Sequence, residues 1–246
     1  MNILEQICND KLAEIDGLRK EYPLQDLIAS PYYLEEGRNI EVNLAQPFII
    51  SEFKRRSPTK PNIDLNAKPA EIVSRYEKQG ASAISVLTNE KYFGGSSKDF
   101  EDIRALTKLP MLRKEFIVDS YQIHETKAIG ADFILLIAAA LDKEELKDFF
   151  DLSVELGLTP LIELHDYEEI KIIPDGAKWI GVNSRNLKTL ETDKSRFKDW
   201  IGDLPENAIK VAESAIDSAE EIADLHNMGY QAFLIGEAFM KNQIAK

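Results

Sequence analysis

The sequence predicts an α/β protein, a closed (β/α)8 barrel with a helical extension at its N-terminus. Short apolar segments of strand type alternate with amphipathic helical segments from Phe48 onward. Strict alternation of strand and helix implies parallel strands joined by right-handed crossovers. Eight strand–helix units favour closure into a barrel over an open sheet, and 246 residues are about the length of one barrel. No linker or change in composition divides the chain, so residues 1–246 are expected to form a single domain.

The first 46 residues do not share this repeating pattern. Apolar side chains between residue 2 and about residue 21 recur at the spacing of one helix face, at Ile3, Leu4, Ile7, Cys8, Leu12, Ile15 and Leu18. Pro23 and Pro31 then break the chain into shorter pieces up to Pro47. We therefore expect residues 1–46 to form a helical extension that leads into the first strand.

Eight apolar runs are the expected strands, at residues 48–53, 83–87, 111–113, 133–137, 159–164, 179–182, 209–212 and 232–235. Helices are expected at residues 69–79, 97–107, 120–129, 143–156, 166–173, 195–200, 218–227 and 237–245. Residues that favour N-caps open four of these helices, at Ser97, Asp142, Asp166 and Ser218. Glycines mark three helix ends, at Gly80, Gly130 and Gly157.

Composition excludes several classes of function. No apolar run is long enough to span a bilayer, and Met1 leads into polar and acidic residues that do not resemble a signal peptide. Cys8 is the only cysteine, so an intrachain disulfide and a cysteine-based metal site are excluded, and a cytoplasmic location is expected. The net charge of −13 argues against nucleic-acid or membrane-surface binding. It leaves room for an anionic small molecule in a cleft with converging lysines and arginines.

The stretch from Pro47 to Lys60 organises the rest of the chain. It begins as a buried apolar strand and changes character within four residues, where Glu52 and Lys54 arrive. Residues two apart on a strand share one face, so these two side chains should project side by side from the carboxyl end. Barrels place their chemistry at that end. The alternative is a charged strand end that solvates its loop.

The ends of the other strands supply a converging set of polar residues. Glu163 lies between Ile162 and Leu164 in an otherwise apolar strand, where a lone carboxylate is costly unless it is paired. Lys114 or Lys54 is the expected partner. A structural ion pair inside the barrel is the alternative.

Further candidates follow the other strands, namely Ser57, Phe93, Asn183, Arg185, Glu213, Ser214 and Gly236. The seventh and eighth loops are short and lead into helices, so their backbone N–H groups can form a phosphate cradle. Ordinary alternatives exist for some of these residues. Arg185 could orient a loop, and the Gly94-Gly95 pair could be a turn. The three histidines are interpreted as ordinary surface or capping residues, and they lack the spacing of metal ligands: His124, His165 and His226.

Seven motifs in register resemble one family. They are ISEFKRRSP, VLTNEKYFGGS, LRKEFIVDSYQI, PLIELHD, IGVNSRNLKT, VAESAI and FLIGEAFM. Together they resemble indole-3-glycerol-phosphate synthase, the ring-closing enzyme of tryptophan biosynthesis, over nearly the whole chain. The resemblance implies a (β/α)8 TIM barrel and a carboxy-lyase that needs no cofactor and no metal. The implied substrate is 1-(2-carboxyphenylamino)-1-deoxyribulose 5-phosphate, which yields indole-3-glycerol phosphate, CO₂ and water.

The resemblance also implies roles for individual residues. Lys114 matches the general acid that protonates the substrate carbonyl, and Glu163 matches the base that removes the final proton. Lys54 matches the second lysine, near the substrate carboxylate, and Glu52 is expected to pair with the lysines. Substrate contacts are implied for Ser57, Phe93, Asn183, Arg185, Glu213 and Ser214, and a phosphate cradle for Ala215, Gly236 and Glu237. No nucleic acid or membrane partner is implied, and a monomer or weak homo-oligomer is expected.

Three positions depart from the pattern of the family. Ala215 and Pro61 stand where many relatives have glycine, and Glu237 brings a charge to a phosphate-facing helix start. Ala215 retains its N–H, so we expect phosphate binding to survive if φ there is negative. Pro61 should stiffen the first loop. We expect the Glu237 side chain to point away while its N–H points inward.

Two other functions fit a barrel of this size. The first is phosphoribosylanthranilate isomerase, an enzyme of the neighbouring pathway step, whose family has a Cys and an Asp as the acid–base pair at its strand ends. In this sequence the only cysteine, Cys8, lies in the expected first helix, and Asn183 occupies the position at the end of the sixth strand. A catalytically idle barrel with a binding or scaffold role is the second alternative. The presence of Lys54, Lys114 and Glu163 together argues against it.

Overall fold

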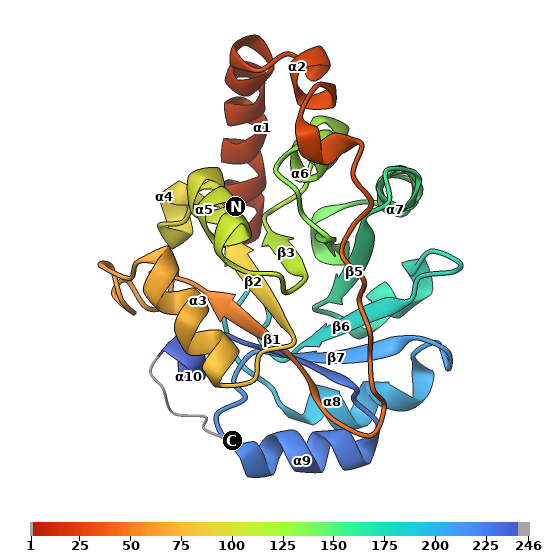
Figure 1. The fold of residues 1–246 in the computed structure, drawn as a ribbon. Helices are drawn as coiled ribbons and strands as arrows, with labels where there is room; N and C mark the ends of the chain where they lie inside the picture. The colour runs from red at the N-terminus through yellow and green to blue at the C-terminus, as the bar shows by residue number, and fades with distance from the viewer. Residues whose placement is uncertain (1, 241–246) are drawn as a thin grey trace.

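The computed structural model describes residues 2–240, which form a closed barrel of eight parallel strands (Figure 1). Each strand pairs with the next along the chain, and the last pairs with the first. The strands are β1 (Phe48–Phe53), β2 (Ala83–Leu87), β3 (Met111–Lys114), β4 (Phe133–Ile137), β5 (Thr159–Leu164), β6 (Trp179–Asn183), β7 (Ile209–Glu213) and β8 (Ala232–Ile235). The predicted (β/α)8 barrel is therefore confirmed.

Helices surround this barrel as an outer layer (Figure 1). They are α3 (Pro69–Lys78), α5 (Ser97–Leu106), α6 (Ser120–Ala128), α7 (Lys143–Glu155), α8 (Ser195–Trp200), α9 (Ala219–Met228) and α10 (Glu237–Met240). The expected helix at 166–173 is instead a 3₁₀ helix, η3 (Tyr167–Ile172). Its sequence is short and rich in β-branched isoleucine, which favours α-helix less. Residues 241–245 of the expected last helix lie outside the described residues.

The helix boundaries largely follow the expected signals. Asp142, Asp166 and Ser218 are N-caps, and their side chains accept backbone N–H groups. The cap of α5 is Ser96 and not Ser97, since the Ser96 hydroxyl accepts the N–H of Asp99. Positive φ angles at the three expected glycines end their helices: Gly80, Gly130 and Gly157. Three short elements were not predicted, namely α4 (Glu90–Phe93), η2 (Ala138–Ala140) and η4 (Ile201–Asp203).

The interior of the barrel changes from apolar to charged along its axis. Alternate residues of a strand point inward, so Phe48 and Ile50 share a face with Glu52, and Leu161 shares one with Glu163. The apolar end is closed by Trp179, whose ring packs edge-on against Phe133 at 5.0 Å between centroids. The charged side chains therefore lie at the carboxyl end of the barrel, and apolar side chains fill the barrel beneath them.

Three strands extend one residue further than predicted. β3, β6 and β7 end at Lys114, Asn183 and Glu213, which were expected to follow their strands. Their backbones belong to the sheet, because Lys114 is aligned with Leu87 and Glu213 with Asn183. The sheet therefore fixes the Cα positions of these three candidate site residues.

The N-terminal extension consists of α1 (Ile3–Glu21), α2 (Leu24–Ile28) and the 3₁₀ helix η1 (Pro31–Tyr33). The extension then runs without regular structure along the barrel to reach β1 (Figure 1). Asp132 binds this irregular segment to the barrel. Its carboxylate accepts a hydrogen bond from the N–H of Arg38 in the segment, at 2.7 Å, and from the N–H of Met111 in β3, at 2.8 Å. Arg104 completes the buried cluster at 3.1 Å. The expected extension is confirmed as helical at its start only.

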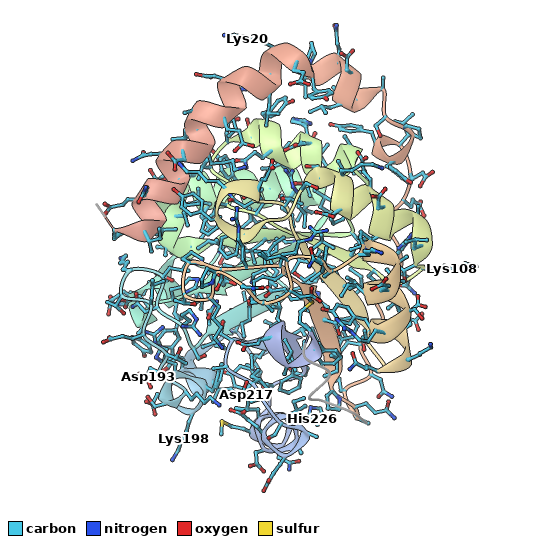
Figure 2. All side chains as sticks on the ribbon, turned by 90° about the vertical axis from the view of Figure 1, so that its left-hand side faces the viewer. Lys20, Lys108, Asp193, Lys198, Asp217 and His226 are labelled. Carbon is cyan, nitrogen blue, oxygen red and sulfur yellow. The ribbon has the colours of Figure 1, made fainter. Side chains whose placement is uncertain are left out.

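Charged side chains project from the outer surface (Figure 2). Figure 2 shows Lys20, Lys108 and Lys198 projecting from the periphery, while His226 lies on the outer helix α9. Within residues 2–240 no helix is both long and apolar enough to cross a membrane.

Replacing Asp132 with alanine is expected to destabilise the fold by about 3–5 kcal/mol, because Arg104 would be left as an unpaired buried charge. Chemical denaturation measures this change. Asp151→Ala is the matched control, since it breaks an exposed pair with Lys147 and should leave the free energy of unfolding nearly unchanged. Equal effects of the two substitutions would contradict the anchoring role of Asp132.

Candidate active site

A cavity of about 260 Å³ opens at the carboxyl ends of the strands. Side chains of β1, β3, β5 and β6 line it together with the loops that follow β1, β7 and β8. All of the predicted site residues except Glu213 are among its lining: Glu52, Lys54, Ser57, Phe93, Lys114, Glu163, Asn183, Arg185, Ser214, Ala215, Gly236 and Glu237. Residues from separate stretches of the chain therefore meet in one place, as expected.

Lys114 is the centre of the charged cluster in this cavity. Its Nζ atom lies 2.8 Å from Oε2 of Glu163 and 3.0 Å from Oε2 of Glu213. Oε2 of Glu52 is 4.0 Å away, and Oε1 of Glu52 accepts a hydrogen bond from Lys54. Lys114 is thus the partner of Glu163, and Lys54 is the partner of Glu52.

Burial and charge act in opposite directions on these groups. Burial alone would lower the pKa of Lys114, but the nearby Glu163, Glu213 and Glu52 carboxylates raise it above its ordinary value. Burial opposes ionisation of Glu163, yet the positive charges of Lys114 and His165 hold its pKa well below the usual range. The pKa of Glu213 is raised well above the usual range by burial and by the charge of Glu163. The site therefore holds two carboxyl groups with opposed proton affinities, a pattern typical of acid–base sites.

Glu213 does not line the cavity, contrary to its prediction as a substrate contact. It is fully buried and lies under Lys114, to which it gives a second carboxylate. A β-carbon at Gly181 would lie 2.0 Å from Oε1 of Glu213, so a side chain at this strand position would displace the Glu213 carboxylate. A glycine within an apolar strand was the available sequence signal for a close approach.

His165 is not the surface or capping residue that was predicted. Its side chain is only 3% exposed and lies behind Glu163, with Nε2 2.6 Å from Oε1 of the glutamate. The other ring nitrogen, Nδ1, lies 2.8 Å from the carbonyl oxygen of Arg185. Because His165 is two residues after Glu163, the shared side of the strand was the signal that could have found it.

The loop after β7 is strained. Ser214 and Ala215 have φ angles of 70° and 53°, in the left-handed region that non-glycine residues rarely adopt. The hydroxyl of Ser184 donates to the carbonyl of Ser214 at 3.0 Å and holds the turn. The condition of a negative φ at Ala215 is therefore not met. A left-handed residue turns its N–H in the direction that anion-binding nests use.

The loop after β8 comes close to the charged cluster. A β-carbon at Gly236 would lie 2.5 Å from Oε1 of Glu52 and 3.2 Å from Nζ of Lys54. Glu237 forms an ion pair with Lys60 from the loop after β1, so its charge is neutralised by a lysine that also lines the cavity. The negative charge that Glu237 brings to this helix start is therefore paired with Lys60.

The remaining candidates also have structural roles. Arg185 donates to the carbonyl of Leu190 at 3.1 Å, and its own N–H is bound by the side chain of Asn183. The loop-orienting interpretation of Arg185 therefore holds alongside its place in the cavity wall. Phe93 packs against Phe116, with 6.0 Å between ring centroids, and gives the cavity an aromatic side. The hydroxyl of Ser57 accepts the N–H of Lys60.

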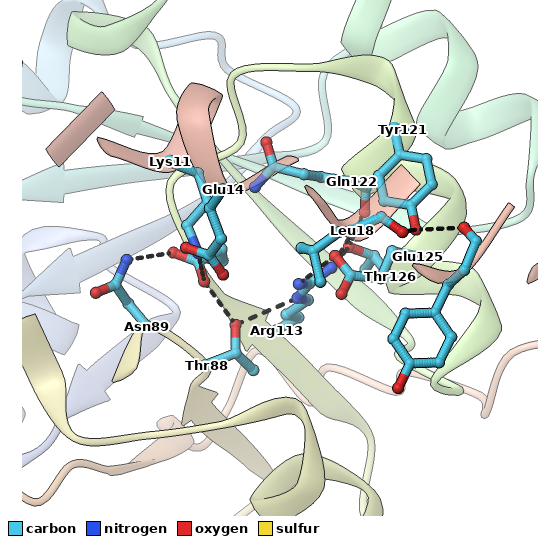
Figure 3. Close-up of polar contacts among 12 residues, drawn as sticks. Lys11, Glu14, Leu18, Thr88, Asn89, Arg113, Tyr121, Gln122, Glu125 and Thr126 are labelled. Atoms are coloured by element: carbon cyan, nitrogen blue, oxygen red, sulfur yellow. Dashed lines mark hydrogen bonds and ion pairs between the residues drawn. The ribbon is translucent and has the colours of Figure 1, made fainter. Parts of the chain in front are cut away.

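Helix α1 forms part of the wall, through Ile3, Leu4 and Ile7. The sequence did not show what holds the helix there. Lys11 reaches from α1 to Glu115, directly after Lys114, at 3.1 Å, and the two side chains are only 6% and 1% exposed (Figure 3).

Glu115 is fully engaged by its neighbours. Thr88 and Asn89 each donate to its carboxylate at 3.1 Å, and the N–H of Phe116 donates at 2.9 Å. Figure 3 also shows Arg113 linking this cluster to the α6 side chains, where it donates to Glu125 at 2.6 Å. The extension is therefore bound to the segment that carries Lys114.

Among residues 2–240, no group of three or more histidine, cysteine, aspartate or glutamate side chains is arranged to hold a metal ion.

These features define a class of protein, a (β/α)8 barrel with ionisable side chains gathered at the carboxyl ends of its strands, as barrel enzymes have them. A family model described as indole-3-glycerol phosphate synthase matches residues 4–246. The chain belongs to this family.

Individual relatives agree. The chain is 42% identical to indole-3-glycerol phosphate synthase of Bacteroides thetaiotaomicron over 98% of its own length and 93% of the relative's. It is 40% identical to the Micrococcus luteus protein of that name, again over 98% and 93% of the two chains. The chain is thereby placed among enzymes of tryptophan biosynthesis.

Solved structures show the same fold at low identity. N-acetylmannosamine-6-phosphate 2-epimerase from Clostridium perfringens aligns with a TM-score of 0.59 at 16% identity, covering 85% of this chain and 95% of that one. A chain of the tryptophan synthase complex of Pyrococcus furiosus aligns with a TM-score of 0.57 at 15% identity, covering 79% and 88%. These similarities concern the fold alone.

Lys11→Met is expected to release helix α1 from the barrel, because Glu115 would lose its cationic partner in a buried position. The expected loss is about 3–5 kcal/mol of unfolding free energy, with faster amide hydrogen exchange in α1. Lys91→Met is the control, since its pair with Asp10 of α1 is exposed. Unchanged exchange in the Lys11 variant would contradict the anchoring role.

Ala215→Gly is expected to raise the free energy of unfolding by up to about 1.5 kcal/mol. Relief of a left-handed alanine gains roughly 1–2 kcal/mol, while the added freedom of glycine in the unfolded chain costs roughly 0.5–1 kcal/mol. Ala29→Gly is the control, because φ there is −79° and only the cost applies. Denaturant unfolding of both variants measures the difference, and a less stable Ala215→Gly protein would contradict the strain.

Proposed function

We propose that this protein is an indole-3-glycerol-phosphate synthase. The reaction is the decarboxylating ring closure and dehydration of 1-(2-carboxyphenylamino)-1-deoxyribulose 5-phosphate to indole-3-glycerol phosphate, CO₂ and water. It is a carboxy-lyase step in tryptophan biosynthesis that uses no cofactor. The observation that carries the proposal is the meeting of Lys114, Lys54 and Glu163 around one cavity, in a chain of this family.

The proposed chemistry explains why these residue types are needed. Attack of the aromatic carbon on the substrate carbonyl breaks aromaticity, so the carbonyl must be made more electrophilic. The Lys114 ammonium is assigned as the acid that donates a proton to the carbonyl oxygen. Loss of CO₂ from the ring carbon leaves the electron pair of the broken C–C bond in the ring and restores its conjugation.

Dehydration then needs an acid for the departing hydroxyl and a base for the ring proton. Lys54 is assigned near the substrate carboxylate and as a candidate acid, with Glu52 as its partner. Glu163 is assigned as the base, since its low pKa keeps it ionised at neutral pH. Phe93 is assigned to cover the anthranilate ring, because it gives the cavity an aromatic side.

The substrate's phosphate is assigned to the loops after β7 and β8. The backbone of Ala215, Gly236 and Glu237 is proposed to hold the phosphate, at the two loops where barrels commonly bind it. Ser57, Asn183, Arg185 and Ser214 are proposed as further substrate contacts. We expect a monomer or weak homo-oligomer, and the single cysteine, Cys8, fits a reducing cytoplasm.

Lys114→Ala is expected to abolish detectable turnover, since a placed acid contributes about 10²–10⁴-fold and two buried carboxylates lose their cation. Appearance of indole fluorescence from the synthetic substrate measures the rate, and circular dichroism checks the fold. Lys98→Ala on the exposed face of α5 is the control. Turnover at the wild-type rate in Lys114→Ala would overturn the assigned role.

The acid side of the pH–rate profile should reflect the low pKa of Glu163. A base must be ionised, and burial is outweighed by Lys114 and His165, so the Glu163 carboxylate gains its proton only well below its ordinary pKa of 4.5. Protonation of Glu163 should therefore not reduce kcat/KM between about pH 7 and pH 5. The comparison of wild type with Glu163→Gln at each pH isolates this group, and a ratio that collapses within that interval would contradict the assignment.

A further inference from the structure

His165 contacts two oxygen atoms, one on each ring nitrogen. Nδ1 lies 2.8 Å from the carbonyl oxygen of Arg185, and Nε2 lies 2.6 Å from Oε1 of Glu163. A carbonyl oxygen only accepts hydrogen bonds, so Nδ1 must carry a proton. A neutral ring with its proton on Nδ1 has a lone pair on Nε2, and this lone pair would face the carboxylate. One proton must therefore lie between Nε2 of His165 and Oε1 of Glu163.

The other oxygen of Glu163 decides on which atom this proton resides. Oε2 accepts a hydrogen bond from Lys114 at 2.8 Å, and a cation at this distance favours the ionised carboxylate. Both glutamate oxygens are then acceptors, one for an ammonium and one for a ring N–H. This arrangement places the shared proton on Nε2 and makes His165 an imidazolium.

We propose that His165 is a positioning residue of this site, an imidazolium that holds Glu163 ionised and aimed at the cavity. The proposal rests on the function proposed above, in which Glu163 removes the ring proton. His165 acts only through Glu163, because its ring lies behind the glutamate and is 3% exposed. It orients the carboxylate so that Oε2 faces Lys114 and the substrate.

Charged groups around His165 come from several elements. Glu163 precedes it on β5, while Lys114 of β3 and Glu213 of β7 lie beyond that carboxylate. The carboxylate of Glu169 accepts the backbone N–H of His165, and Arg196 donates to its backbone carbonyl at 2.9 Å. The latter two contacts fix the main chain and leave Glu163 as the ion that contacts the ring.

Nitrogen NMR of the histidine rings tests the protonation directly. The chain has only three histidines, and the variants His124→Gln, His165→Gln and His226→Gln assign their signals. At neutral pH both ring nitrogens of His165 should be protonated, because each contacts an acceptor oxygen. Glu163→Gln should abolish this state at the same pH. A bare ring nitrogen on His165 in the wild-type protein would overturn the proposal.

Kinetics test the role in the reaction. His165→Leu should lower kcat by at least about 10-fold, less than the roughly 10²–10⁴-fold contribution of the general base itself, and should leave KM within about twofold. His165→Gln should recover part of the loss, since its amide can donate to Glu163 but cannot titrate. A folded His165→Leu enzyme with wild-type kcat would contradict the proposal.

The two proposals fail in different ways. A wild-type protein that forms no indole product would overturn the proposed function, whereas the ring protonation of His165 would still be measured without any substrate. An active wild-type enzyme with a neutral His165 would overturn the positioning role alone. His226→Gln is the matched kinetic control. His226 lies on the outer helix α9, and its Nδ1 atom lies 2.9 Å from the carbonyl oxygen of Tyr230 (Figure 2).

Discussion

The buried contact of Lys114 with Glu163 and Glu213 is the constraint on which the rest of the site depends. Ions this deeply buried are stable only when they are closely paired, so the three side chains must stay together in the folded protein. They can do so because β3, β5 and β7 bring their inward-facing positions to the same level of the barrel. The parallel sheet aligns these three residues, and the apolar rings of Phe133 and Trp179 pack together beneath them.

Small residues make room for this cluster. A side chain at Gly181 would collide with Glu213, and one at Gly236 would collide with Glu52 and Lys54. The loops after β7 and β8 therefore lie close to the charged groups, and the proposed phosphate-binding site is a short distance from the lysines. Helix α1 then closes one side of the cavity and is bound to the segment after Lys114 through Lys11 and Glu115.

The barrel and the polar residues at its strand ends could be predicted from the sequence, because both follow from local patterns, while Ala215 and Glu237 came only from the family resemblance. Apolar runs of strand length predict the strands, the period of two puts Glu52 and Lys54 on one face, and Glu163 stands out as a carboxylate in an apolar strand. Contacts between distant segments carry no such pattern. Lys11 looks like any polar residue on an amphipathic helix, and its partner Glu115 is distant in sequence. The prediction for His165 is wrong because tertiary packing, which has no local pattern, buries this residue against Glu163.

A crystal structure of the protein with indole-3-glycerol phosphate bound tests the central claim most directly. The account predicts the phosphate at the N–H groups of Ala215 and Gly236, the indole ring beside Phe93, and Nζ of Lys114 within hydrogen-bonding distance of the product. Lys114 should keep its contact with Glu163 in that complex. A product bound elsewhere, or a Lys114 side chain turned out of the cavity, would contradict the account.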